Sequence, residues 1–95
     1  MPRMLPAAQA EWLEAAAYYE EQQPTLGERF VSQVDSAILQ IAENPEAFGQ
    51  VEPPYRCKLV SGFPYAIYYR ILPDEIVIMA IAHTSRRPGH WQERS

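Results

Sequence analysis

One run of residues restricts the fold of this chain more than any other feature. Ile76 to Ala82 reads IVIMAIA and is apolar at every position. Strand side chains alternate between the two faces of a sheet, so a strand of this kind must be covered on both faces. A chain of 95 residues has room for only one core. We therefore expect a single domain over residues 1–95, folded around this strand.

Two segments before this run also have the pattern of strands. Tyr55 to Val60 alternates, with Tyr55, Cys57 and Leu59 on one face. Phe63 to Leu72 is rich in aromatic and β-branched residues, and turn residues separate the three segments. The sequence therefore predicts an antiparallel β-meander over about residues 55–82.

The first half of the chain has the pattern of two helices. Residues 7–22 contain no Gly or Pro and repeat apolar residues at helical spacing, and Pro24 ends this segment. The same periodicity returns from Leu26 to Glu43. A linker this short predicts an antiparallel helix hairpin over about residues 7–43, followed by an irregular connection at 44–54.

The polar residues of these helices support two further interpretations. Thr25 and Glu28 have the spacing of a capping box at the start of the second helix. The first helix carries four acids that lie largely off its apolar stripe: Glu11, Glu14, Glu20 and Glu21. We interpret them as a solvated surface; the alternative is a docking face for a basic partner, which their spacing does not favour.

These elements together indicate an α+β fold. The expected architecture is a two-helix antiparallel hairpin packed on a small antiparallel sheet. Residues 1–5 leave room only for a short N-terminal edge strand, because Pro2 and Pro6 interrupt the backbone. Residues 83–95 follow the most apolar strand as a basic C-terminal tail.

Charge and composition exclude several classes of protein. Eight basic and twelve acidic residues give a net charge of −4, which speaks against a broad nucleic-acid surface. The charge is uneven, however: residues 1–50 carry two bases and eight acids, whereas residues 51–95 carry six bases and four acids. No apolar run approaches the roughly 20 residues of a membrane helix, and the N-terminal residues lack the pattern of a secretion signal, so we expect neither a spanning segment nor secretion. The single cysteine, Cys57, fits the reducing cytoplasm.

The basic half supplies the candidate chemistry. His83 and His90 have no standard metal-site spacing with Cys57, so we expect neither a metal nor a cofactor. Metal-free RNA cleavage needs a base, an acid and a cation at the phosphate. His90 is a candidate acid or base, and the candidate phosphate ligands are Arg56, Lys58 and Arg86.

Four groups of residues carry a family resemblance that covers nearly the whole chain. In chain order they are Glu11-Trp12-Leu13-Glu14-Ala15 with Tyr18-Tyr19-Glu20, Leu26-Gly27-Glu28-Arg29-Phe30, Phe63-Pro64-Tyr65-Ala66-Ile67-Tyr68-Tyr69, and Ala82-His83-Thr84-Ser85-Arg86-Arg87-Pro88-Gly89-His90-Trp91. With these motifs the chain resembles the RelE/ParE superfamily of toxins from type II toxin–antitoxin modules. The resemblance implies an N-terminal strand, a helix hairpin, an antiparallel sheet, and a cognate antitoxin that binds the toxin in a hetero-oligomer.

The resemblance implies two alternative targets. ParE-like toxins inhibit DNA gyrase, whereas RelE-like toxins cut messenger RNA on the ribosome without a metal. His90 stands where many relatives have Tyr, and the FPY and RRPG motifs with the acidic balance favour the ParE-like branch. An inactive relative that only binds its antitoxin is a third alternative. The expected target- or antitoxin-binding residues are Arg56, Lys58, Arg70, His83, Arg86, Arg87, Trp91 and Arg94.

Overall fold

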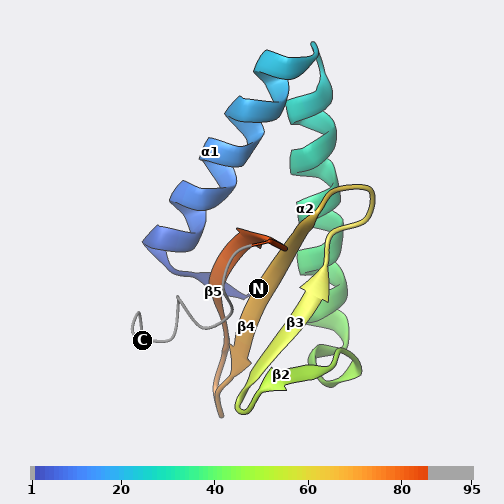
Figure 1. The fold of residues 1–95 in the computed structure, drawn as a ribbon. Helices are drawn as coiled ribbons and strands as arrows, with labels where there is room; N and C mark the ends of the chain where they lie inside the picture. The colour runs from blue at the N-terminus through green and yellow to red at the C-terminus, as the bar shows by residue number, and fades with distance from the viewer. Residues whose placement is uncertain (1, 86–95) are drawn as a thin grey trace.

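The computed structural model describes residues 2–85 and contains two helices and five strands in that part of the chain. In chain order the elements are β1 (Arg3–Met4), α1 (Pro6–Gln22), α2 (Leu26–Glu43), the short 3-10 helix η1 (Pro45–Ala47), β2 (Gln50–Glu52), β3 (Tyr55–Leu59), β4 (Tyr65–Ile71) and β5 (Ile76–His83). The two helices form a hairpin that packs against the sheet (Figure 1). The expected α+β fold is confirmed.

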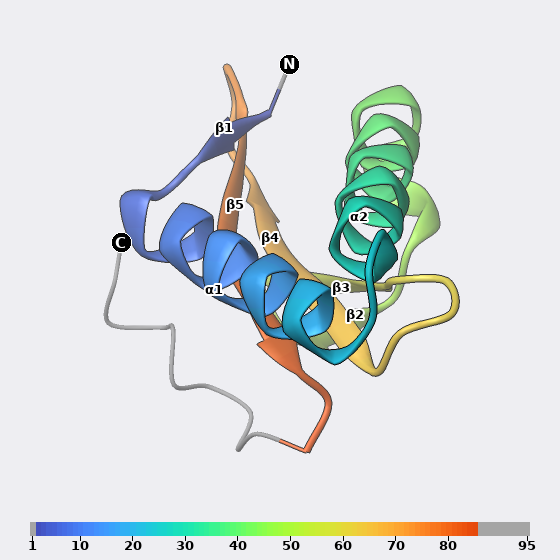
Figure 2. The same ribbon diagram turned by 90° about the horizontal axis from the view of Figure 1, so that it is seen from above.

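The strands form one sheet in the order β1-β5-β4-β3-β2. The three strands of the predicted meander pair antiparallel, as expected, and β5 lies inside the sheet. The expected edge strand is present as β1, but it runs parallel to β5, with Arg3 beside Val77 and Met4 beside Ile78. The sheet is therefore mixed. Figure 2 shows β1 alongside β5.

The connection predicted to be irregular holds more structure than expected. It contains η1 and the exposed strand β2, which pairs antiparallel with β3. Gln50, Val51 and Glu52 are all exposed at the edge of the sheet, so this segment does not need the apolar pattern by which a buried strand is recognised in a sequence. Here pairing with β3, rather than burial, determines the strand.

Strand β5 contributes to two buried clusters on opposite faces of the sheet. Toward the helices, Ile78 and Ile81 pack with a core that includes the fully buried Phe30 of α2. On the other face, Val77 and Met79 belong to a second cluster. This double burial is what the uninterrupted apolar run predicts.

The junction of the two helices differs from the predicted capping box. Thr25 has a positive φ of 72°, and its side chain makes no capping hydrogen bond. The cap comes instead from Glu20 of α1, whose carboxylate oxygens accept hydrogen bonds from the Thr25 and Gly27 amides, each at 3.0 Å. The prediction failed because a sequence spacing cannot show that a carboxylate on the preceding helix reaches the free amides at the start of α2.

Candidate functional site

Arg56 and Lys58 lie on the side of β3 that faces the segment after α2. The Nη1 atom of Arg56 donates hydrogen bonds to the carbonyl oxygens of Phe48, at 2.7 Å, and Glu46, at 3.2 Å. The Lys58 ammonium lies 4.8 Å from the centre of the Phe48 ring, a cation–π distance. Both predicted site residues therefore hold residues 46–48 against the sheet.

The hydroxyl of Tyr69 strengthens the same contact. It donates a hydrogen bond of 2.6 Å to the carbonyl oxygen of Pro45, beside the two carbonyls that Arg56 binds. Burial raises the pKa of the Tyr69 hydroxyl, and the nearby charge of Arg56 partly opposes that rise. The phenol therefore stays protonated at neutral pH and acts as a donor.

Arg70 lies on the opposite face of the sheet from Arg56. In the register of the sheet, Arg70 stands between Tyr55 of β3 and Val77 of β5, and both belong to the cluster on the face away from the helices. Arg56 is paired with Tyr69, which belongs to the core on the helical face. The structure therefore does not bring Arg70 together with Arg56 and Lys58.

His83 is the last residue of β5 and lies beside Tyr65, with the ring centres 5.4 Å apart and nearly perpendicular. Its Nδ1 atom accepts a hydrogen bond from the Ser85 amide at 3.1 Å and lies 2.8 Å from the Ser85 hydroxyl oxygen. A backbone amide can only donate, so Nδ1 must carry a lone pair here. This bond ties the imidazole to the backbone at the end of β5.

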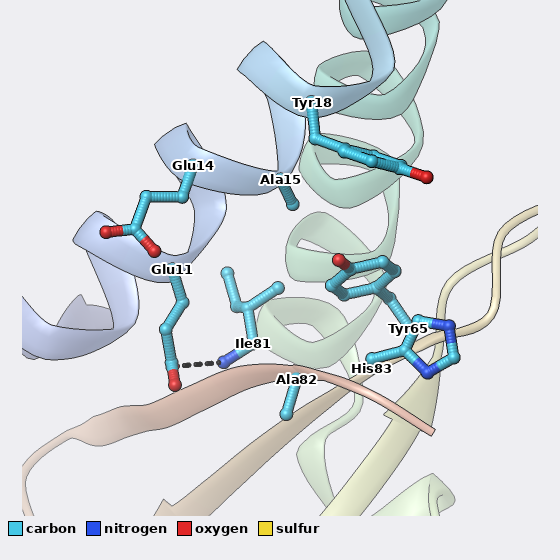
Figure 3. Close-up of a pocket in the computed structure, with 8 residues that line it drawn as sticks. All are labelled: Glu11, Glu14, Ala15, Tyr18, Tyr65, Ile81, Ala82 and His83. Carbon is cyan, nitrogen blue, oxygen red and sulfur yellow. Dashed lines mark hydrogen bonds between the residues drawn. The ribbon is translucent and has the colours of Figure 1, made fainter. Parts of the chain in front are cut away.

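A groove of about 280 Å³ separates α1 from the end of β5. Its lining residues are Glu11, Glu14, Ala15, Tyr18, Tyr65, Ile81, Ala82 and His83. Glu11 and Glu14 lie on one side of the groove, and Tyr18, Tyr65 and His83 on the other (Figure 3). The Glu11 carboxylate accepts a hydrogen bond of 3.1 Å from the Ile81 amide, which fixes that carboxylate at the edge of β5.

The sequence predicts that the acids of the first helix form a solvated surface. Glu20 is exposed, as predicted, but it also caps α2. Half-buried Glu11 departs from the prediction, because its carboxylate binds the β5 backbone. The spacing of Glu11, Glu14 and Tyr18 places them on one face of a helix, and this spacing is the sequence feature that could have pointed to the groove. What the sequence could not show is that this face borders β5.

Tyr65 reaches the groove from a cluster of aromatic rings. The rings of Tyr19 and Phe30 lie 5.2 Å apart, and each also contacts Phe63 and Tyr65 at centre distances of 4.9–6.0 Å. Offset and perpendicular rings at such distances attract each other beyond simple burial. The cluster ties the turn before β4 to the helix hairpin and holds Tyr65 in place.

The remaining predicted site residues, Arg86, Arg87, His90, Trp91 and Arg94, lie outside the described residues. Among residues 2–85, no group of three His, Cys, Asp or Glu side chains is arranged to hold a metal ion. Burial raises the pKa of the half-buried Cys57 thiol, and a hydrogen bond with Tyr68 lowers that pKa by a smaller amount. Cys57 is therefore a poor nucleophile.

Comparison with known proteins identifies the family. The family model described as the ParE toxin of the type II toxin-antitoxin system, parDE, matches residues 3–88. The chain belongs to this ParE toxin family. The match extends from β1 to beyond the end of β5, so it includes both faces of the sheet and the groove.

A solved structure has the same ParE-like fold. The structure described as "Chromosomal ParDE TA system from P. aeruginosa" contains a chain that matches with a TM-score of 0.64 and 17% sequence identity. The match covers 85% of this chain and 91% of that chain. No curated protein matches the sequence. Neither helix within residues 2–85 combines the length and the apolar character needed to cross a membrane.

Proposed function

We propose that this ParE-family chain is a cytoplasmic toxin that inhibits DNA gyrase by protein–protein contact and is neutralised by a cognate antitoxin in a hetero-oligomer. The observation that carries the proposal is the family match over residues 3–88, most of the chain. The matched solved structure, whose description names a ParDE system, supports the fold on which the proposal depends.

The arrangement of the cations favours contact with a protein over RNA cleavage. A nuclease of this size needs its phosphate-binding cations to converge on one site. The Arg56 guanidinium already binds two backbone carbonyls, and Arg70 lies across the sheet from it. With the global charge of −4, the described cations give weak support to a phosphate-binding surface.

A supercoiling assay tests the proposed target. Purified full-length chain is added to DNA gyrase, relaxed plasmid and ATP, and the supercoiled fraction is measured on a gel. We expect inhibition that increases with the amount of chain and disappears when the same preparation is heat-denatured. Unimpaired supercoiling at a large molar excess of folded chain would contradict the gyrase target.

The nuclease alternative makes a different prediction in a second assay. One observation favours it: Arg56 and Lys58 stand two residues apart on one face of β3. Primer extension on translated messenger RNA should then show new cuts with the wild-type chain and fewer with Lys58→Gln. If the messenger RNA is not cut and gyrase is clearly inhibited, the ParE-like function stands as proposed. Absence of both activities, without growth arrest on expression, identifies an inactive relative.

The proposed neutralisation requires a stable complex with the antitoxin. Co-expression with the product of an adjacent short open reading frame should restore growth and yield a complex on size exclusion. If that product neither binds the chain nor relieves its effect, the proposed antitoxin is excluded.

A further inference from the structure

A row of side chains crosses the face of the sheet that points away from the helices. Ile67 and Ile81 belong to the core on the helical face. Strand side chains alternate, so the adjacent Ala66 and Ala82 point to the opposite face. These two alanines are directly paired between β4 and β5, and Ala66 is paired on its other side with Leu59 of β3. The row therefore runs from β3 to β5 as Leu59, Ala66 and Ala82.

The exposure changes sharply along this row. Leu59 is 62% exposed, whereas Ala66 is 1% and Ala82 is 2% exposed. A buried side chain must have other atoms packed against it on every side. A methyl group rises little above the sheet, so an alanine on an open face keeps part of its surface in contact with water. A covering layer therefore lies over Ala66 and Ala82 and leaves Leu59 open.

No element within residues 2–85 provides this cover. Both helices pack on the opposite face of the sheet. Strand β1 ends beside Ile78, short of Ala82, and β2 lies at the other edge of the sheet, beyond β3. Tyr68, the next residue of β4 on this face, hydrogen-bonds with Cys57 of β3 and so reaches away from β5. The second buried cluster, on the same face, includes neither alanine.

The chain beyond the described part leaves from the end of β5 at which the two alanines lie. Strand β5 ends at His83, directly after Ala82, and residues 86–95 follow Ser85. An extended chain from Ser85 to Trp91 spans up to about 20 Å, so it can turn back over the face. Met1, in contrast, precedes β1 at the other end of β5. Residues 86–95 are therefore the part of the chain that can reach both alanines.

Trp91 is the large apolar side chain of this segment, whose sequence is RRPGHWQERS. An aromatic side chain of this kind buries about 150–250 Å² when it packs, enough to cover two neighbouring methyl groups. We propose that residues 86–95 fold back across the face of the sheet away from the helices, with the Trp91 ring on Ala66 and Ala82. The inference concerns this intramolecular contact and does not depend on whether the chain acts on gyrase or on the ribosome.

This contact has a consequence for the predicted binding residues. Arg70 lies on the same face of the sheet as the two alanines, because it pairs with Tyr55 and Val77 of the second cluster. The segment that Trp91 anchors also carries Arg86, Arg87 and Arg94. The cations of this segment then share one face of the sheet with Arg70, whereas Arg56 and Lys58 lie on the other.

The test uses the full-length chain with ¹³C-labelled alanine methyl groups. In the wild type we expect nuclear Overhauser contacts from the Trp91 indole to the Ala66 and Ala82 methyl groups. We also expect a soluble gadolinium chelate to relax these two methyl groups weakly. Trp91→Ser should remove the contacts and increase this relaxation several-fold, because the alanines then face water.

Controls within the same samples separate loss of this cover from unfolding. Ala8 is fully buried in the core on the helical face, so its relaxation should stay low in Trp91→Ser. Ala17 is exposed on α1 and gives the relaxation of an open alanine. Gln92→Ser changes the next residue of the segment and should leave Ala66 and Ala82 as in the wild type.

Three results would overturn the proposal. Wild-type Ala66 and Ala82 that relax as strongly as Ala17 would show that the face is open. Weak relaxation without contacts to Trp91, unchanged in Trp91→Ser, would exclude Trp91 as the cover. Protection that increases with protein concentration would make a second copy the occupant. If Trp91→Ser does not fold, the wild-type contacts alone decide between these results and the proposal.

Discussion

At the scale of single residues, Glu20 connects the two helices. Its carboxylate accepts the Thr25 and Gly27 amides and so replaces the cap that Thr25 does not provide. Glu20→Ala should lower the free energy of unfolding by about 1–2 kcal/mol, because two amides at the start of α2 lose their acceptor. Urea denaturation measures the loss. Glu21→Ala, one residue further along the exposed end of α1, is the matched control and should change stability far less.

Gly27 gives a second prediction at this scale. A Cβ at this position would lie 2.5 Å from the Ala16 carbonyl oxygen, a backbone atom of the other helix. Gly→Ala in a helix usually stabilises by up to about 1 kcal/mol, but here the clash should outweigh that gain. We expect Gly27→Ala to lower the melting temperature, whereas Gly49→Ala, which meets nothing within 4 Å, should leave it nearly unchanged. An unchanged melting temperature for Gly27→Ala would mean that the helices are not in such close contact.

These residue-level contacts are where the sequence was least informative. Periodicity predicted both helices with an apolar face on each, and in the structure the apolar face of α2 buries Phe30, Val34 and Ile41. It could not show that Glu11 reaches Ile81, because those residues are 70 positions apart and meet only through the packing of α1 on the sheet. A capping box likewise depends on the spacing of residues within one helix, and in this chain a carboxylate of the preceding helix takes its place.

At the scale of elements, β1 is held to the sheet by few contacts. It has two residues, and the Leu5 amide adds one hydrogen bond of 3.1 Å to Ile78. The Arg3 guanidinium also binds both carboxylate oxygens of Glu75, at 3.0 and 3.1 Å, just before β5. The sequence predicted a short edge strand but not its parallel direction, since the crossover through the helix hairpin determines that.

The Arg3–Glu75 pair gives the edge strand a pH dependence. The hydrogen bond from Arg3 lowers the pKa of Glu75, so the contribution of the pair is present above the ordinary carboxyl pKa and is lost as pH falls through the lowered value. We expect hydrogen exchange at the Leu5 amide to quicken in Glu75→Gln at neutral pH. The wild type should approach the variant at low pH and in high salt, because both groups are exposed. Equal protection of the two proteins at neutral pH would contradict a role for the pair.

At the scale of the whole molecule, the sheet divides the predicted binding residues. Strand alternation correctly placed Arg56 and Lys58 on the face opposite Tyr55 and Leu59. The face of Arg70 depends on the register between β3 and β4, which alternation within one strand does not determine. For this reason the sequence predicted one set of binding residues, although the fold places Arg56 and Arg70 on opposite faces of the sheet. The predicted binding residues between positions 86 and 95 lie outside the described part of the chain.

This division yields a test of which face carries the proposed activity. Arg56→Met should lower stability by about 1–2 kcal/mol, because the carbonyls of Glu46 and Phe48 lose their donor, yet inhibit gyrase as well as wild type at equal folded concentration. Arg70 makes no hydrogen bond or ion pair within residues 2–85, so Arg70→Met should retain stability. If the face away from the helices binds the target, Arg70→Met should need several times more protein for half-maximal inhibition. Urea denaturation gives the folded fraction of both variants. If folded Arg56→Met no longer inhibits gyrase while Arg70→Met still does, the activity lies on the helical face instead.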